Sequence, residues 1–282
     1  MSIRIVTDSG ADLEREEYQQ CDVELIPLGL TIDGRIYRAD EKFNKTDFFR
    51  LLEAAKVFPK TSQPAPAEFE QLFEAAKQAG DQVVYISIAS ALSGTFQTAS
   101  VVKAMGEYED VWIVDSRSAT LGQKQLVMEA VRLRSQGKTS PEIAEALERI
   151  RSRVRVYAGL DTLEYLRKGG RLGRAAAGLG TLARIKPVVT ISPEGAVQVA
   201  GKCMGKARAM KEILGLTEKV QPDPNYPIYG VYSGSQEAAL ELAAKLAEQG
   251  IELPPEQIFG LGPVIGAHIG PGAYGVVYIA KE

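Results

Sequence analysis

Short apolar runs rich in β-branched residues alternate with helical patterns through the first half of the chain. These runs predict strands at residues 3–8, 23–33, 83–88 and 111–115. Between them, residues 66–80 begin with proline and end on glycine, and residues 94–106 follow the third run, so both segments predict helices. The alternation predicts β-α-β-α crossovers and a largely parallel sheet with helices on both faces.

A helix at residues 140–154 is predicted to close this first part of the chain. The sequence places Ser140 as its N-cap and Pro141 at the first helical position. Apolar residues recur at helical spacing after the proline. The segment therefore predicts an amphipathic helix that packs on the preceding strands.

The pattern changes after Arg155. A glycine-rich segment at residues 169–180 precedes residues 185–202, whose Pro-Glu-Gly turn predicts a hairpin. The remaining periodicity predicts helices at residues 204–220 and 235–250 and strands at residues 228–234 and 274–280. We therefore predict an α/β fold in two parts. Residues 1–155 form a parallel-sheet domain with helices on both faces, and residues 156–282 form a smaller α+β domain.

Composition and charge exclude several classes of function. The 282 residues carry 33 Lys and Arg against 36 Asp and Glu, a net charge of −3, so no general attraction to nucleic acid is expected. Two separated cysteines, Cys21 and Cys203, and one histidine indicate neither a disulfide framework nor a metal site. The sequence shows no signal-peptide pattern and no apolar stretch of roughly 18 residues that could span a membrane. We therefore expect a cytoplasmic protein.

Ser93, Gly94 and Thr95 form the first candidate anion site. They lie between a buried strand and the next helix, where free backbone N–H groups and the helix dipole favour negative charge. A serine that only caps the helix would give the same pattern. Both interpretations use the same side-chain oxygen, so both stay open from these residues alone.

Thr61 and Ser62 form a second hydroxyl cluster. They precede Pro64, which favours extended backbone at the residue before it and makes residues 61–65 a defined loop entering the next helix. Threonine and serine are also common at such junctions in the absence of a ligand. The cluster is therefore a candidate only if the fold brings it to another polar group.

The single histidine, His268, is the third candidate. It lies among glycines, prolines and small residues at 266–273, and this composition predicts a segment outside the regular core elements. Its imidazole could donate to a carboxylate or phosphate, titrate near neutral pH or act as a general base. A histidine bonded only to backbone carbonyls is the alternative.

Motifs for other chemistries are absent or incomplete. No GxGxxG motif opens a helix after the first strand, and residues 195–202 lack the spacing and the final hydroxyl residue of a phosphate loop. GxSxG does not occur, so a nucleophile elbow is unsupported. A triad of Ser93, His268 and Asp115 is conceivable on composition alone.

Residues 163–174 form a basic run with glycines in it. Arg167, Lys168, Arg171 and Arg174 fall within eight positions of a chain that is acidic as a whole. Such a run usually forms a solvated surface. Alternatively, it docks an acidic partner or an anionic group on one.

Taken together, these motifs resemble those of the DegV family of bacterial fatty-acid-binding proteins. The resemblance includes TSQPAPAEF at residues 61–69 and GPVIGAHIGPGA at residues 262–273. Its other segments, in the same order as in the family, are residues 5–13, 88–97, 114–123, 163–174 and 185–202. An ordered set that spans nearly the whole chain is highly specific.

The resemblance implies that a long acyl chain is buried between or beneath the two domains, with no further cofactor. The carboxylate of this fatty acid would lie among Thr61, Ser62, Ser93, Gly94, Thr95 and His268. Family members often carry an arginine-rich stretch near the carboxylate, after the hairpin. This chain has Lys202, Lys206 and Arg208 there, and which of them replaces the arginine is open.

The resemblance further implies a partner, a fatty-acid kinase subunit that phosphorylates the carboxylate with ATP. The acyl phosphate would feed phospholipid synthesis, so this chain would carry the substrate and would not itself be the enzyme. The segment with Arg167, Lys168 and Arg171 resembles the part that engages the kinase. Exchange of the ligand would bring transient contact with a membrane.

Two other functions are carried as alternatives. A serine esterase could use Ser93 and His268 on acyl esters, although the missing nucleophile elbow argues against it. A regulatory module could bind a small phosphate-bearing metabolite at the same hydroxyl clusters. The substantial apolar content favours a fatty-acid carrier over this module.

Overall fold

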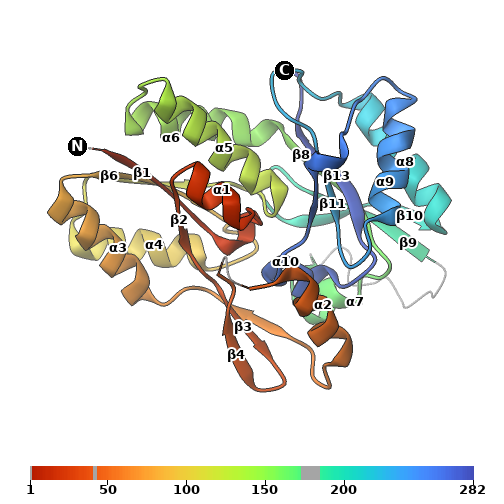
Figure 1. The fold of residues 1–282 in the computed structure, drawn as a ribbon, viewed down its shortest axis with the longest axis horizontal. Helices are drawn as coiled ribbons and strands as arrows, with labels where there is room; N and C mark the ends of the chain where they lie inside the picture. The colour runs from red at the N-terminus through yellow and green to blue at the C-terminus, as the bar shows by residue number, and fades with distance from the viewer. Residues whose placement is uncertain (1, 41–42, 173–184) are drawn as a thin grey trace.

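The computed structural model describes residues 2–40, 43–172 and 185–282. Figure 1 shows two main parts, each built on its own sheet, with a smaller part below them. The first sheet is four-stranded and parallel, in the order β2-β1-β6-β7. Its strands are β1 (Ile3–Asp8), β2 (Val23–Ile26), β6 (Gln82–Ser87) and β7 (Val111–Asp115). The parallel sheet predicted from the alternating pattern is therefore confirmed.

Helices cover both faces of this sheet, as predicted. Phenylalanines of α3 (Pro66–Ala79) and small apolar residues of α4 (Thr95–Gly106) pack on one face. Side chains of α5 (Leu121–Ser135) and α6 (Ser140–Ile150) pack on the other. The N-cap of α6 is Thr139 and not the predicted Ser140, because Thr139 and Glu142 form a reciprocal capping box.

The single strand predicted at residues 23–33 is wrong. Proline at position 27 has no N–H for a strand ladder, and the N–H of Leu28 donates to Ser9 Oγ instead, at 2.9 Å. The chain leaves the parallel sheet there and enters a separate three-stranded antiparallel sheet in the order β4-β3-β5. Its strands are β3 (Gly29–Ile32), β4 (Arg35–Arg38) and β5 (Lys60–Ser62). The predicted loop at residues 61–65 therefore begins as a strand.

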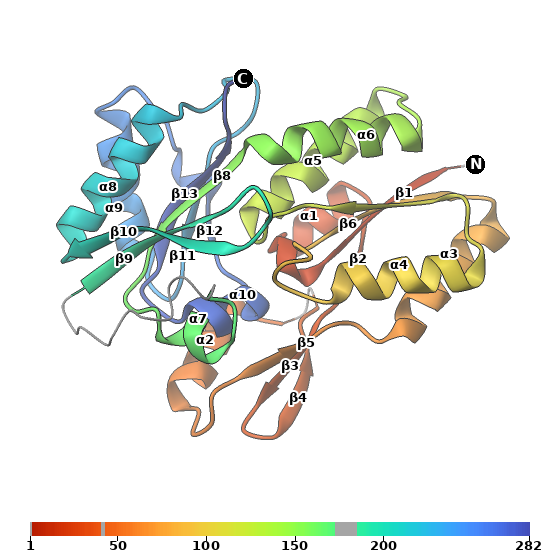
Figure 2. The same ribbon diagram turned by 180° about the vertical axis from the view of Figure 1, so that it is seen from behind.

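The second large sheet is six-stranded and mostly antiparallel, in the order β10-β9-β8-β13-β11-β12. Its members are β8 (Val154–Gly159), β9 (Ile185–Ile191), β10 (Val197–Met204), β11 (Tyr229–Tyr232), β12 (Ile258–Gly260) and β13 (Tyr274–Ile279). The predicted hairpin is the pair β9 and β10. α8 (Lys206–Lys219) and α9 (Glu237–Ala247) cover the outer face, and α5 packs against β8 and β13 (Figure 2).

The domain boundary predicted after residue 155 falls within β8, the first strand of the second sheet. One continuous apolar cluster joins the parallel sheet, α5 and the inner face of the second sheet. The division into two domains stays a prediction. What the structure adds is that α5 lies between the two large sheets and contacts both.

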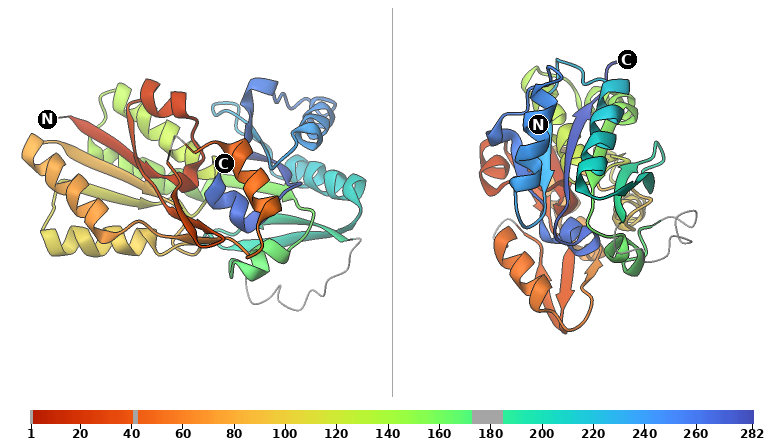
Figure 3. Two further views of the ribbon diagram at one scale, coloured as in Figure 1. Left: turned by 60° about the horizontal axis from the view of Figure 1, so that its bottom comes forward. Right: turned by 90° about the vertical axis from the view of Figure 1, so that its right-hand side faces the viewer.

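The smaller part contains the three-stranded sheet and α2 (Lys45–Ala54), and it packs against α10 (Pro263–Ile269). α10 in turn packs against α7 (Glu164–Lys168). Figure 3 shows these helices beside one another on the side where the two main parts meet. α1 (Arg15–Gln20) lies next to β2. Within the described ranges, no helix is long and apolar enough to cross a membrane.

His268 lies in α10, so the expectation that it sits outside a regular element is wrong. Pro263 occupies the start of the helix, where a missing N–H costs nothing. Gly270 ends the helix at a φ of 75°, a conformation that glycine adopts without strain. The glycines and prolines around His268 thus mark the two ends of a short helix.

Candidate functional site

The main pocket lies where the carboxyl ends of the parallel strands face the inner side of the second sheet. The loops after β6 and β7 contribute Ile88, Leu92, Ser93, Ala119 and Thr120. In open parallel sheets, ligands bind at this edge, at the point where the order of the strands along the sheet changes direction. Here that point lies between β1 and β6. With its opening to solvent included, the pocket has an empty volume of about 850 Å³.

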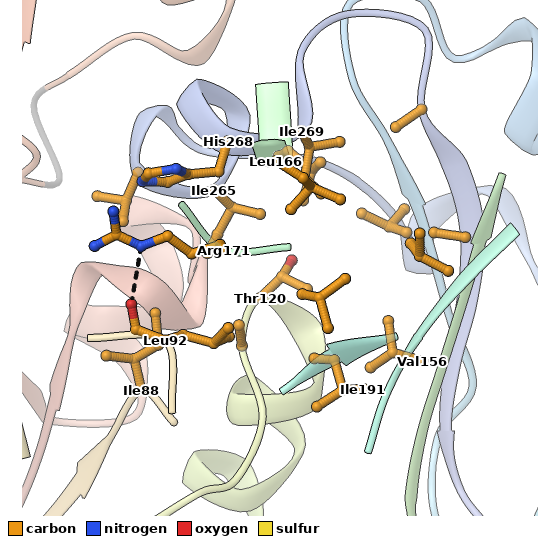
Figure 4. Close-up of a pocket in the computed structure, with 18 of the residues that line it drawn as sticks. Ile88, Leu92, Thr120, Val156, Leu166, Arg171, Ile191, Ile265, His268 and Ile269 are labelled. Atoms are coloured by element: carbon orange, nitrogen blue, oxygen red, sulfur yellow. Dashed lines mark hydrogen bonds between the residues drawn. The ribbon is translucent and has the colours of Figure 1, made fainter. Parts of the chain in front are cut away.

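Most of the pocket wall is aliphatic. Strands β8, β9 and β11 supply Val156, Ala158, Val189 and Val231, and helix α10 supplies Val264, Ile265 and Ile269. Figure 4 shows lining side chains around the pocket, among them Val156, Ile265 and Ile269. A wall of this kind excludes water and favours an extended apolar ligand.

Four polar side chains gather at one end of the pocket, which we call the polar end: Thr61, Ser93, Arg171 and His268. Thr61 Oγ1 and His268 Nε2 are 2.8 Å apart and share a hydrogen bond. Arg171 lies close enough to His268 to affect its pKa, and it is bonded to the carbonyl next to Ser93. All four are partly exposed, whereas the strand residues deeper in the pocket are mostly buried.

His268 is neutral at physiological pH. Burial, and then the positive charge of Arg171, lower the pKa of its imidazole from 6.5 to about 4. The Nδ1 atom is buried without a hydrogen-bond partner among the described residues. It lies directly against Gly169, where a Cβ atom would be only 2.2 Å from it. Only glycine at position 169 allows the ring to occupy this place.

Arg171 is held across the pocket by two backbone carbonyls. Its Nε donates to the Leu92 carbonyl at 3.1 Å and its Nη1 to the Gly169 carbonyl at 2.6 Å. Figure 4 shows the guanidinium beside the His268 ring. Burial lowers the pKa of Arg171, with no acidic group acting on it. The polar end therefore carries one positive charge that no described carboxylate neutralises.

The predicted hydroxyl residues are only partly brought together. Thr61 and Ser93 line the pocket, but Ser62 is exposed on the opposite face of β5, because strand side chains alternate. Ser93 Oγ is 2.8 Å from Thr95 Oγ1 and also accepts weakly from the Thr95 N–H at 3.4 Å. Thr95 is fully buried behind it.

Gly94 is the N-cap residue of α4 and lies against the Gln63 side chain. A Cβ atom at position 94 would be 2.1 Å from Gln63 Oε1. Gln63 Nε2 donates to Thr98 Oγ1 at 2.6 Å and so crosses the start of the helix. The first turn of α4 is thus partly covered by protein, and Gly94 does not line the pocket.

The basic residues predicted after the hairpin lie elsewhere. Lys202, Lys206 and Arg208 are exposed, and none of them lines the pocket. Lys206 is paired with Glu241 at 3.0 Å. The structure therefore brings none of the three to the polar end. Arg171 occupies that place, a role that sequence reasoning missed because it assigned this arginine to a partner surface.

The rest of the basic run is on the surface. Lys168 pairs with Glu164 within α7 at 2.7 Å and lies over the Phe58 ring. Arg167 is exposed beside it. Arg174 lies outside the described residues. Arg167 and Lys168 therefore lie on the surface, shortly before Arg171 in the chain.

The conceivable esterase triad is not assembled. His268 Nε2 is bonded to Thr61, and Ser93 Oγ to Thr95. Asp115 accepts from Ser90 and from the Arg117 N–H, so it orients a surface loop and not the imidazole. Among the described residues, no cluster of three His, Cys, Asp or Glu side chains has the geometry to hold a metal ion.

Comparison with known proteins agrees with this geometry. Residues 2–281 match the family described as "Uncharacterised protein, DegV family". A DegV domain-containing protein of Listeria monocytogenes is 34% identical over 285 residues, covering 99% of both chains. A solved fatty-acid-binding DegV family protein from Thermus thermophilus has 34% identity and a TM-score of 0.88, covering 100% of both chains. A stearic-acid-binding protein from Eubacterium ventriosum has 26% identity and a TM-score of 0.87, covering 100% of this chain and 99% of its own.

Proposed function

The chain belongs to the DegV family, and from this membership and its pocket we propose that it binds a long-chain fatty acid. The observation that carries the proposal is the pocket itself: a long aliphatic wall with an unneutralised arginine and three further polar side chains at one end. Each buried methylene contributes about 0.8 kcal/mol, so the tail supplies most of the affinity. The fatty-acid-binding protein from Thermus thermophilus and the stearic-acid-binding protein from Eubacterium ventriosum support the same ligand class.

The polar end suits a carboxylate better than a neutral group. Arg171 supplies the opposite charge, and the hydroxyls of Thr61 and Ser93 can each donate a hydrogen bond. A carboxylate next to His268 favours the protonated imidazole and so raises the pKa that burial and Arg171 lower.

We propose further that the chain acts in the cytoplasm as a carrier, presenting the carboxylate to a fatty-acid kinase subunit. The acyl phosphate formed there would enter phospholipid synthesis. Two features support this role. The polar end is partly exposed, and α7 places Arg167 and Lys168 on the surface, shortly before Arg171 in the chain, where they can attract an acidic partner.

The binding proposal is tested by comparing a long-chain acid with its methyl ester. The ester keeps the tail but has no charge, so we expect it to bind at least about tenfold more weakly, a difference of about 1.4 kcal/mol. Arg171→Gln should reduce this preference for the acid. Arg208→Gln is the control, because Arg208 is an exposed arginine outside the pocket. Equal affinity for acid and ester in the unaltered protein contradicts the proposal.

The carrier role is tested by separating binding from phosphorylation. Ser93→Ala and His268→Ala should lower kinase-dependent formation of acyl phosphate more than they lower acid binding, because the tail supplies most of the affinity. The two quantities are measured on the same preparations with kinase and ATP added. Equal losses in both assays refute this division of labour.

A further inference from the structure

Part of the pocket wall must move before a long acyl chain can enter, because most of the strand residues that line the pocket are buried. Strands β8, β11 and β13 are fixed, since each is hydrogen-bonded to a strand on both sides. The β9–β10 hairpin has a freer end, residues 191–199, which we call the hairpin arm. Ile191 and Val197 of this arm line the pocket, and Figure 4 shows Ile191 among the side chains around it.

The arm has a hinge where it leaves the sheet. β9 is bonded to β8 only through residues 188–190, and residues 154–156 of β8 have no partner on that side among the described strands. In β10 the register shifts after Val199, so that Ala200 is an extra residue. Such a bulge interrupts the ladder and bends the strand. Because Val199 pairs with Val189, the bulge lies opposite the last bonds to β8, and the arm can turn there as a unit.

The tip of the arm rests on the first part of the molecule, and Figure 2 shows the turn of the hairpin reaching toward it. A Cβ atom at Gly195 would be 2.9 Å from Ala89 Cβ and 3.1 Å from Arg117 Cα, so the tip contacts the loops after β6 and β7. Its hydrogen bonds stay within the turn, from the Ser192 N–H to the Ala196 carbonyl and from the Gly195 N–H to the Ser192 carbonyl, both at 2.8 Å. Within the described ranges, no hydrogen bond or ion pair joins residues 192–196 to these loops. A contact without polar bonds separates at low cost.

A polar tie lies where the arm meets the polar end. Leu172 pairs with Val197 in an isolated β-bridge, and the preceding residue, Arg171, donates to the Leu92 carbonyl at 3.1 Å. Leu92 belongs to the loop after β6, so Arg171 links the segment bonded to the arm with a loop on which the tip rests. A carboxylate bound beside Arg171 keeps the guanidinium at the polar end and so favours the closed arm.

We propose that the hairpin arm is the lid of the acyl pocket. It turns about the bulge at Ala200 and lifts its tip from Ala89 and Arg117, which opens the space behind Ile191 to an entering or leaving tail. Closure returns Ile191 and Val197 to the wall and shields the tail from water. This inference rests on the proposed function and assigns the movement that lets the ligand enter.

The test measures the rates of uptake and release of parinaric acid, a fluorescent long-chain acid, by rapid mixing. Gly195→Ala adds a Cβ atom that meets Ala89 and Arg117 when the arm is closed. This disfavours the closed arm whether the pocket is empty or filled. We therefore expect both rates to rise about tenfold while the dissociation constant changes little.

Gly34→Ala is the matched control. Gly34 also has a positive φ, 80°, in the turn of a hairpin, but a Cβ atom there meets nothing within 4 Å. Its variant therefore carries the same kind of backbone strain without the contact. Both rates should stay as they are in the unaltered protein.

A second measurement needs no variant to fold. Hydrogen exchange of residues 191–199 in the unaltered protein should slow when stearic acid is bound, because the acid favours the closed lid. Exchange of residues 35–38 should not change, because β4 is an edge strand that contributes no residue to the pocket.

Two results overturn the inference. One is that Gly195→Ala raises only one of the two rates, or neither, relative to Gly34→Ala. The other is that bound stearic acid leaves hydrogen exchange of the arm unchanged. If the unaltered protein takes up neither parinaric acid nor stearic acid, the proposed function itself fails, so the two failures are distinguishable.

Discussion

His268 shows how one buried side chain couples the site to pH. Its pKa is about 4 in the folded protein and 6.5 in an unfolded chain. Between these values the unfolded state binds more protons than the folded state, so the free energy of unfolding falls as the pH falls. The stability that comes from keeping His268 neutral is present above pH 6.5 and is lost as the pH approaches 4.

We predict that His268→Gln removes this pH dependence while keeping a side chain able to bond Thr61. Relative to the variant, the empty unaltered protein should lose about 3 kcal/mol of its free energy of unfolding between neutral pH and pH 4. Denaturant titrations of both proteins at a series of pH values measure the difference. A constant difference across the series would show that His268 is not held neutral by the fold.

The comparison with the variant is necessary because Asp12 acts in the opposite direction. Burial raises the pKa of Asp12 from 3.8 to about 6. Between pH 3.8 and about 6 the folded state binds more protons than the unfolded state. The contribution of Asp12 to the free energy of unfolding therefore falls as the pH rises. The two effects partly cancel in the unaltered protein, but Asp12 is the same in both proteins and cancels from their difference.

At the scale of residues, the candidate site was predicted in part. Thr61, Ser93 and His268 come from three distant segments and lie together as expected. Ser62 was predicted with its neighbour, but the chain forms a strand there and turns the two side chains to opposite faces. The place of Arg171 in the pocket could not be predicted, because two backbone carbonyls hold its guanidinium there. The Leu92 carbonyl is distant in sequence, and the Gly169 carbonyl is available only in this local fold.

At the scale of elements, end signals and apolar spacing were the reliable guides. α3 was predicted from the proline and glycine at its ends and α4 from its place after a buried strand, while apolar residues at helical spacing predicted α6 and the face that it buries. α5 gave no such pattern, because it lies between two sheets and buries polar side chains as well, among them Gln123 and Lys124. Lys124 is 1% exposed and is paired with Glu17 at 2.5 Å, a contact that only the tertiary fold creates.

The contact between α7 and α10 depends on one glycine. We predict that Gly169→Ala pushes the His268 ring away from Thr61, because the new Cβ would lie 2.2 Å from His268 Nδ1. Such overpacking typically costs about 1–3 kcal/mol of stability. Fatty-acid affinity should fall along with it. Urea denaturation and an acid-binding titration on the same variant measure the two effects.

Gly215→Ala is the matched control for this prediction. Gly215 lies inside α8, and a Cβ atom there would meet no atom within 4 Å. Alanine should stabilise the helix by roughly 0.5–1 kcal/mol and leave acid binding unchanged. If Gly169→Ala behaved like this control, the close approach of His268 to α7 would not matter for the site.

At the scale of the whole molecule, the pocket is the space left where α5 and two differently built sheets meet. The sequence predicted both sheets and the hairpin, but not how they face each other, since that depends on the burial of α5. The small third sheet was missed because proline at position 27 divides one apolar run between two sheets. It is this small sheet that brings Thr61 to His268.

The depth of the pocket should set the length of the acid. Val231 on β11 is 3% exposed and is one of the residues that line the pocket. We predict that Val231→Phe fills part of the pocket and shifts the preferred acid to a shorter chain, with a loss of about 0.8 kcal/mol for each methylene excluded. Affinities for a series of saturated acids measure the shift. An unchanged length preference would place the tail elsewhere.

The central claim is that this pocket holds a long-chain fatty acid. The most direct measurement is the mass of the protein as purified from a bacterial host, first native and then denatured, with organic extraction of whatever it releases. The account predicts a native mass that exceeds the denatured mass by one long-chain acid, recovered in the extract at one per chain. A protein that is empty as purified and takes up no added long-chain acid would contradict it.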